Sequence, residues 1–293
     1  AGHRAVVHFA VDNSEVYMTT RLDGPATQFL PFNRGNAGHA GNPPNPHGAA
    51  TAYLWEEVLA KDTWLNILGK FMHVQVSKHR DPATGKVSRC STVIFPRYHQ
   101  HDAVTKLLAD AKKHGPGQRY LVQHSAGSGK TNSIAWLSHQ LSTLHDADSA
   151  KVFDSVLVIT DRTVLDDQLQ DAIYQIDHKR GVVLPIGQGT GSDFAKRFSS
   201  KSQALTEALT TGGAIIVAPI QTGPYALDAV RGSNALAGRR LAGIIGEEPS
   251  SPTRGTCHTP RTTRAGAGAA GPGAAGGTVG RGGRGGAGHY GER

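Results

Sequence analysis

The chain has 293 residues, enough for one large domain or two small ones, and its 38% of hydrophobic residues can form a buried core. Two distant cysteines exclude a disulfide framework, and fifteen histidines without an HExxH pattern argue against a zinc protease. No apolar run is long enough to span a membrane, and no signal peptide is present, so we expect a cytoplasmic protein. The net charge of +8 suggests a polyanionic partner, but six arginines and one glutamate from residue 249 onward supply +5 of it.

The N-terminal part of the chain predicts short hairpins and amphipathic helices. Runs of β-branched and aromatic residues interrupted by turn residues are typical of hairpins, and apolar residues at helical spacing, with Trp55 and Trp64 as anchors, are typical of a helix. A stretch with four glycines and three prolines indicates a loop. In chain order we expect a hairpin over 5–22, a loop over 33–48, a helix over 51–72, a hairpin over 71–96 and a helix over 99–115.

From residue 120 onward the pattern changes to alternating apolar strands and helices. The runs at 152–160 and 214–220 are almost continuously apolar, as in a parallel sheet that is covered on both faces. Alternation of this kind predicts a doubly wound α/β domain. The expected strands are 120–123, 152–160, 214–220 and 241–245, and the expected helices are 131–146, 162–176 and 200–212.

The end of the chain has a different composition. Residues 265–293 contain 13 glycines and 7 alanines among 29 residues, and such a segment buries too little surface to offset its ordering entropy. We therefore expect a disordered tail. It could bind RNA, but only Tyr290 supplies an aromatic ring, so a solvated tail or a read-through in the wrong frame is the simpler interpretation. The chain also begins with Ala-Gly-His and enters a strand at once, which predicts a fragment of a longer protein.

The stretch QHSAGSGKTNS at 123–133 predicts a phosphate-binding loop. Gly127 and Gly129 allow backbone amides to approach phosphate oxygens, and the helix that follows favours negative charge at its N-terminus. Lys130 would reach the outer phosphates, and the Thr131 hydroxyl would hold Mg2+. ATP and Mg2+ are therefore the expected cofactors.

His124 stands where the strict Walker pattern has glycine, so the loop fits the looser form found in helicases. A glycine-rich turn without a ligand is the alternative, but a strand expected before the loop and a helix expected after it favour the phosphate loop. The expected ATP-binding residues of the loop are Ser125, Ala126, Gly127, Ser128, Gly129, Lys130 and Thr131.

The stretches HSAGSGKT and ITDRTVLDDQL, together with VHFAVDNSEVYMTTRL, FLPFNRG, GNPPNP and TAYLWEEVL upstream, resemble the motor (R, or restriction) subunit of type I restriction enzymes. The resemblance covers about residues 5–250. Subunits of this family carry an endonuclease domain followed by two RecA-like domains of a superfamily 2 DNA translocase. The resemblance implies an ATP-hydrolysing type I site-specific deoxyribonuclease. Such an enzyme pulls double-stranded DNA through a complex with methyltransferase and specificity subunits.

The resemblance implies a division into three parts. Residues 1–90 would be the C-terminal part of an α+β nuclease domain with its connector, residues 91–248 the first RecA-like domain with its parallel sheet, and residues 249–293 the disordered tail. The family's nuclease carboxylates and its second RecA-like domain match no stretch of the 293 residues. We therefore expect the chain to be inactive alone.

The resemblance also assigns roles to single residues. Gln100, in RYHQ, matches the glutamine that hydrogen-bonds adenine, because an amide can both donate and accept; a surface glutamine is the alternative. Thr160 and Arg162, in ITDR, match residues that contact DNA phosphates, although Arg162 could also be a solvated charge. Gln221 lies where the family has another DNA-contacting segment, although its neighbours differ from the family pattern.

One motif departs from the family. At the place of GIIGEEPSS the family has a strand that ends in Asp-Glu-Ala-His, in which Asp orders Mg2+ and Glu orients the attacking water. Here Gly246 replaces the Asp, whereas Glu247 is kept as the expected catalytic residue. Glu248 and Pro249 replace the Ala and the His. Because the metal would lose one anchor, we expect very poor ATP hydrolysis.

The sequence leaves three functions open. The first is an ATP-dependent DNA translocase and restriction subunit. The second is a non-catalytic ATP- or DNA-binding remnant of such a subunit, from a decayed or misread gene. The third is a small-molecule kinase, which ITDRTVLDDQ and the lack of a lid or acceptor-site pattern disfavour.

Overall fold

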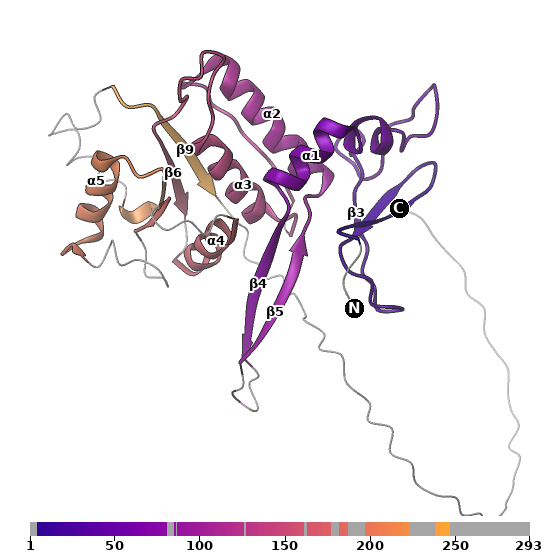
Figure 1. Ribbon diagram of the computed structural model, residues 1–293, viewed down its shortest axis with the longest axis horizontal. Coiled ribbons are helices and arrows are strands. Elements are labelled where there is room, and N and C mark those ends of the chain that lie inside the picture. Colours follow the sequence, from indigo (N-terminus) through magenta and orange to yellow (C-terminus); the bar gives the residue numbers. More distant parts are fainter. Residues whose placement is uncertain are drawn as a thin grey trace, which may run out of the picture. The chain divides into compact units, whose positions relative to one another are not determined.

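The computed structural model describes residues 5–80, 85, 87–125, 127–160, 163–176, 182–186, 197–222 and 238–246, with the backbone alone at 78–80 and 163–168. All of them belong to one compact unit, Ala1–Arg254, shown as the coloured ribbon of Figure 1. The expected tail at 249–293 lies outside the described residues. So do three of the expected site residues, Ala126, Arg162 and Glu247.

The N-terminal sheet begins with the expected hairpin, which is confirmed. Strand β1 (His8–Val11) pairs antiparallel with β2 (Val16–Thr19). The Asp12 carboxylate closes the turn between them, because it accepts hydrogen bonds from the backbone N–H groups of Ser14 and Glu15, both at 2.7 Å. This is the turn chemistry for which an aspartate at the end of a strand is suited.

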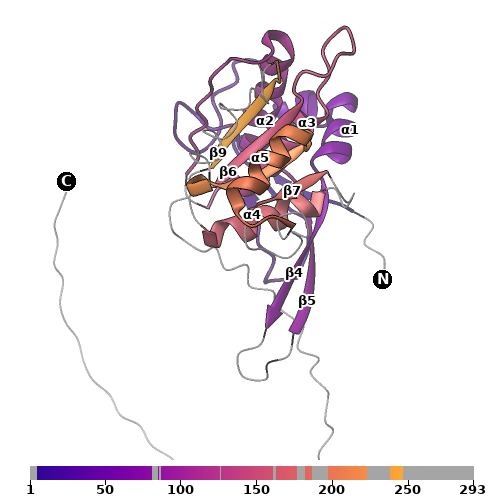
Figure 2. The ribbon, with the colours of Figure 1, turned by 90° about the vertical axis from the view of Figure 1, so that its left-hand side faces the viewer.

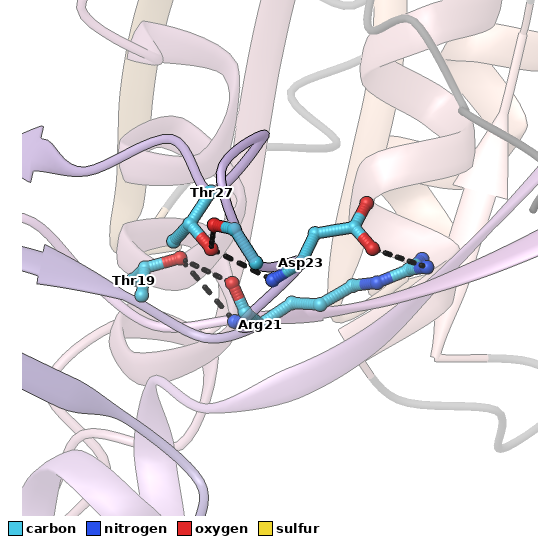
Figure 3. A network of polar contacts seen from close by, with 5 residues as sticks. Thr19, Arg21, Asp23 and Thr27 are labelled. Carbon is cyan, nitrogen blue, oxygen red and sulfur yellow. Dashed lines mark hydrogen bonds and ion pairs between the residues drawn. The ribbon is translucent and has the colours of Figure 1, made fainter.

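The chain leaves β2 through a second turn that leads to β3 (Leu30–Pro31), the third strand of this sheet. Figure 3 shows the polar contacts that hold this turn. The Thr19 hydroxyl donates to the backbone carbonyl of Arg21 at 2.9 Å, and the Thr27 hydroxyl accepts from the backbone N–H of Asp23 at 2.7 Å. The Arg21 and Asp23 side chains approach to 3.9 Å, an exposed ion pair that adds little stability.

The single helix expected over 51–72 is wrong, because two shorter helices form there. The π-helical turn η1 (Leu54–Val58) and helix α1 (Lys61–Lys70) are separated at Ala60, whose ψ of 137° is extended. Both helices still contribute to one core, η1 through Leu54 and Val58 and α1 through Ile67. Trp55, which was expected to be an anchor, is 51% exposed.

Trp64 does act as an anchor. Its ring packs against Phe95 with a centroid separation of 5.8 Å. Both rings belong to the N-terminal core, which the first sheet, η1, α1 and the start of the next helix form together. The buried members of this core are Val16, Met18, Phe32, Tyr53, Leu54, Val58, Ile67, Phe95 and Tyr98.

Strands β4 (His73–Arg80) and β5 (Val87–Ile94) form the second expected hairpin, which is confirmed. The hairpin is a two-stranded sheet of its own and extends away from the helices in Figure 1. Helix α4 (Thr163–Ile176) holds its outer edge through Gln175. The side-chain amide of Gln175 accepts from the backbone N–H of Val76 at 2.8 Å and donates to the Val76 carbonyl at 3.3 Å.

Helix α2 (Tyr98–His114) confirms the helix expected over 99–115. At its start, the Gln100 side chain accepts a hydrogen bond from the backbone N–H of Arg97 at 2.8 Å. At its end, Gly115 has a φ of 69°, in the left-handed region where a helix commonly stops at glycine. Helix α3 (Lys130–Ser142) packs against α2 and ends earlier than expected.

Four parallel strands form the main sheet, in the order β7-β8-β6-β9. They are β6 (Ser155–Thr160), β7 (Val183–Pro185), β8 (Ile215–Pro219) and β9 (Leu241–Gly246). The strands expected near β6, β8 and β9 are confirmed within a few residues. Strand β7 has no counterpart among the expected strands, because three residues ending in proline give no recognisable strand pattern.

Helices cover both faces of this sheet, and in Figure 2 helix α5 (Lys201–Thr211) lies in front of it. One face packs against α3 and α4, in a cluster that includes Ala135, Val156, Val158, Ile173 and Val217. The other face packs against α5, in a cluster that includes Leu157, Ala204, Leu205, Leu209 and Ile216. This layering confirms the expected α/β class with a parallel sheet. No helix in the described ranges is long and apolar enough to cross a membrane.

The strand expected at 120–123 is wrong. The segment is not a strand, and Leu121 is 92% exposed. A strand needs a neighbour for its backbone N–H and C=O groups, and no described strand pairs with this segment. Instead the Tyr120 hydroxyl donates a short hydrogen bond to the Asp110 carboxylate on α2. The apolar residues before the loop therefore reach the surface.

Candidate nucleotide-binding site

The loop at 124–130, of which the structure describes all residues but 126, ends at Lys130, the first residue of α3. Gly127 and Gly129 have φ values of 70° and 80°, in the left-handed region that glycine adopts without strain. Gly129 is the N-cap of α3, and its carbonyl accepts from the backbone N–H of Asn132 at 3.1 Å. The N-terminus of a helix carries a partial positive charge, so the end of this loop suits an anion.

Lys130 folds back onto the loop. Its Nζ donates to the carbonyl of His124 at 3.1 Å and to the carbonyl of Ser125 at 3.4 Å. The ammonium group is therefore held by the same loop that the sequence assigns to phosphate. A charged ligand could replace the two neutral carbonyls as its partner, because hydrogen bonds between charged groups are stronger.

Gln100 ties α2 to this loop. Its amide nitrogen donates to the carbonyls of Ser128 at 3.1 Å and Gly129 at 2.9 Å, while its oxygen accepts from the N–H of Arg97. Gln100 is only 3% exposed. A hydrogen bond from this amide to adenine would require it to give up a contact with the loop. The adenine role of Gln100 stays a prediction.

Replacing Gly129 with alanine is expected to strain the loop against Gln100. A Cβ at Gly129 would lie 2.5 Å from the buried Gln100 Nε2, and the φ of 80° disfavours any other residue. We expect the free energy of unfolding, measured by urea denaturation, to fall by about 1–3 kcal/mol. Gly117→Ala is the matched control, because Gly117 has a φ of 105° with nothing within 4 Å. Equal losses in the two variants would show that Gln100 does not constrain the loop.

Two histidine rings lie beside the loop, and sequence reasoning assigned neither of them a role. His99 of α2 meets His124 edge to face with ring centroids 4.9 Å apart, and His99 Nε2 lies 3.2 Å from the Ser128 carbonyl. Burial lowers the pKa of His99; the Ser128 contact opposes this, and Arg97 and His124 add to it. Burial also lowers the pKa of His124, and the Lys130 charge lowers it further. Both shifts favour the neutral form of the rings.

Two hydroxyl groups complete the loop. Ser128 is 5% exposed, and within the described part of the chain its Oγ has no hydrogen-bond partner. Thr131, the second residue of α3, is half-buried. No group of three or more His, Cys, Asp or Glu side chains in the described ranges could hold a metal ion. Mg2+ at Thr131 would thus depend on phosphate oxygens for its other ligands, which is how this ion is commonly bound.

The strands β6, β8 and β9 end at the same edge of the sheet. The register pairs Thr160 with Pro219 of β8 and with Gly246 of β9. Gln221 follows β8 in the short turn η3 (Ile220–Thr222) and is exposed. The structure therefore brings Thr160, Gln221 and Gly246 together where ligands of open α/β sheets usually bind. Thr160 is 2% exposed, so Gln221 is the more accessible of the two expected DNA contacts that the structure describes.

The end of β9 lies beside α3. A Cβ at Gly246 would lie 3.0 Å from the side chain of Ile134, which is in the second turn of α3. Gly246 thus stands next to the helix that carries Lys130 and Thr131. The carboxyl edge of the sheet and the helix that follows the loop therefore meet at Ile134.

Residues 99–225 match the family model of the SWI2/SNF2 ATPase. The matched region begins in α2, includes the loop at 124–130 and runs past η3. It supports a helicase-like ATPase domain of superfamily 2, and with it the use of ATP, typically together with Mg2+. No curated protein and no solved structure matches the chain.

Proposed function

We propose that the chain is the ATP-binding motor part of a DNA translocase and restriction subunit of a type I restriction-modification system. The observation that carries the proposal is the loop at 124–130, which holds the Lys130 ammonium group at the start of α3, beside the carboxyl edge of a parallel sheet. The SWI2/SNF2 match supports an ATP-dependent motor on nucleic acid. The stretches HSAGSGKT and ITDRTVLDDQL favour the restriction family.

In this function the residues of the loop bind and orient the nucleotide. Lys130 and the positive end of the α3 dipole would bind the phosphates, and Gln100 would keep the loop in position through Ser128 and Gly129. The Thr131 hydroxyl would hold Mg2+, which neutralises charge on the phosphates when it is bound. The neutral rings of His99 and His124 would line the same loop.

The carboxyl edge of the sheet would contact DNA. Gln221 is exposed there, Thr160 is the last residue of β6, and Arg162 follows two positions later in the sequence. Contacts of this kind to the phosphate backbone position a motor without reading the base sequence. Within a type I system, the methyltransferase and specificity subunits would be the protein partners, double-stranded DNA the substrate, and the cytoplasm the location.

A second candidate function is a non-catalytic ATP- and DNA-binding remnant of such a subunit. Gly246 at the end of β9 favours it, because glycine offers no carboxylate at the position where the family anchors Mg2+. The two candidates share the nucleotide site and differ only in whether ATP is hydrolysed.

The proposal predicts DNA binding that responds to nucleotide. The affinity for a fluorescent 30-base-pair duplex, measured by anisotropy at several salt concentrations, should change when a non-hydrolysable ATP analogue is added. Lys130→Ala should remove the effect of the analogue, whereas Lys112→Ala, an exposed residue of α2, should keep it. The chain should also co-elute with a methyltransferase–specificity complex in gel filtration. Nucleotide-sensitive DNA binding without co-elution would favour another superfamily 2 motor over the restriction family.

A further inference from the structure

We propose that His99 and His124 are nucleotide-binding residues that become protonated when the loop binds phosphate, so that nucleotide affinity increases as pH falls. The proposal rests on the proposed function of the loop at 124–130 as a phosphate site. It adds two titrating ligands to the residues that the phosphate-loop pattern predicts.

The contact of His99 with the loop fixes which ring nitrogen can take up the proton. His99 Nε2 lies 3.2 Å from the Ser128 carbonyl, and a carbonyl oxygen can only accept. Nε2 therefore carries the hydrogen in the neutral ring, and Nδ1 is the nitrogen that gains a proton. Protonation at Nδ1 leaves the bond to Ser128 intact, so the loop need not rearrange.

The charged groups that act on the two rings are all basic. Arg97 acts on His99, and Lys130 acts on His124. His99 also lies in the first turn of α2, where the helix dipole disfavours a positive charge. In the empty loop these neighbours and burial keep the rings neutral. A phosphate bound beside the two rings would reverse the balance, because its negative charge would offset the positive charges of Arg97 and Lys130.

The loop also contains a polar group that has no partner. Ser128, whose carbonyl contacts His99, has an Oγ that is buried and makes no hydrogen bond within the described residues. A buried hydroxyl without a partner costs about 1–3 kcal/mol, so its presence points to a ligand that supplies one. Phosphate oxygens would satisfy this hydroxyl, the Lys130 ammonium group and the two protonated rings together. The ligand class is a nucleoside di- or triphosphate.

The direction of the pH effect follows from these shifts. Without ligand, the pKa of each ring lies below its usual value of 6.5. With phosphate bound the pKa of each ring rises. Binding therefore takes up protons at pH values between the pKa of the empty form and the pKa of the complex. The gain in affinity is fully present below the pKa of the empty form and is lost as pH rises through the pKa of the complex. A rise of one unit in one histidine corresponds to about a tenfold gain.

Calorimetry of the full chain with ADP tests the proposal. Titrations at pH 7.0 in two buffers with different ionisation enthalpies give the number of protons taken up, and titrations from pH 6 to 8.5 give the affinity profile. The wild type should take up protons and bind ADP about tenfold or more tightly at pH 6 than at pH 8. The double variant His99→Gln, His124→Gln, whose amides cannot titrate in this range, should lose both effects. His47→Gln, in an exposed loop, is the control.

The outcomes separate this proposal from the proposed function. The terminal phosphate of ADP also titrates, with a pKa near 6 in related phosphates, but it does so equally in every variant. Wild-type proton uptake that persists in the double variant would overturn the histidine proposal. The phosphate loop itself would still stand if Lys130→Ala removed ADP binding at pH 8.5. If the wild type bound no ADP at any pH, both the histidine proposal and the proposed function would fail. If the double variant does not melt cooperatively, the two single variants test the proposal instead. Each of them should lose part of the proton uptake on ADP binding.

Discussion

Replacing Lys130 with alanine is expected to remove most of the affinity of the chain for ATP and ADP. The ammonium group lies against the carbonyls of His124 and Ser125, inside the loop that would hold the phosphates. A hydrogen bond to a charged group contributes about 1.5–3 kcal/mol, which corresponds to a loss of about 10- to 150-fold. Calorimetric titration at pH 8.5, the alkaline end of the profile proposed above, measures the loss where protonation of the loop histidines contributes least.

The matched control for this experiment is Lys112→Ala. Lys112 is an exposed lysine in the last turn of α2, so its replacement removes one positive charge at a distance from the loop. Its nucleotide affinity should stay within about twofold of the wild type, since exposed charges are screened by salt. If the two variants bound nucleotide equally well, the loop at 124–130 would not be a phosphate site.

The chain is expected to hydrolyse ATP only at the background rate, and Gly246→Asp is expected to raise its Mg2+-dependent nucleotide affinity. Gly246 ends β9 without a carboxylate, and the loss of one well-placed electrostatic group typically costs about a hundredfold or more in rate. The new Cβ would lie 3.0 Å from Ile134 Cδ1, the end of a flexible side chain, so a small shift of Ile134 admits it. Phosphate release and calorimetry with and without Mg2+ measure the two effects.

Gly243→Asp is the control for this replacement. It introduces the same carboxylate into the same strand at a position with nothing within 4 Å, but away from the carboxyl edge. It should leave Mg2+-dependent binding unchanged. Robust hydrolysis by the unaltered chain would mean that Glu247 or Glu248 takes the place of the missing Asp, and our interpretation of GIIGEEPSS would be wrong.

The main sheet could be predicted because its central strands can be recognised from their apolar composition alone. The continuous apolar runs that become β6 and β8 are buried on both faces, so composition alone indicates them. Residues 120–123 have a similar composition but no partner strand among the described residues, and composition cannot report a missing partner. The break at Ala60 was likewise invisible, because the apolar spacing continues through it while the backbone does not.

Without the family resemblance, the candidate site could be predicted only where its residues are neighbours in sequence. The glycines, Lys130 and Thr131 follow one another at a spacing that reflects how a loop meets phosphate. The contacts of His99 and Gln100 with Ser128 join α2 to a loop almost thirty residues later. Such a pairing depends on how α2 packs against α3, which no local pattern encodes. The motif thus identified the ligand class, and the fold added the groups that surround it.

The amide of Gln175 has a consequence for how this chain meets other strands. By donating to and accepting from the same residue, Val76, it reproduces the hydrogen-bonding pair that a neighbouring peptide would offer to the outer edge of β4. Open strand edges are the usual starting point for unwanted pairing between molecules. At Val76 that edge is already occupied by a side chain, so a foreign strand could dock there in register only by displacing α4. The hairpin is thus protected against aggregation at the point where it is anchored.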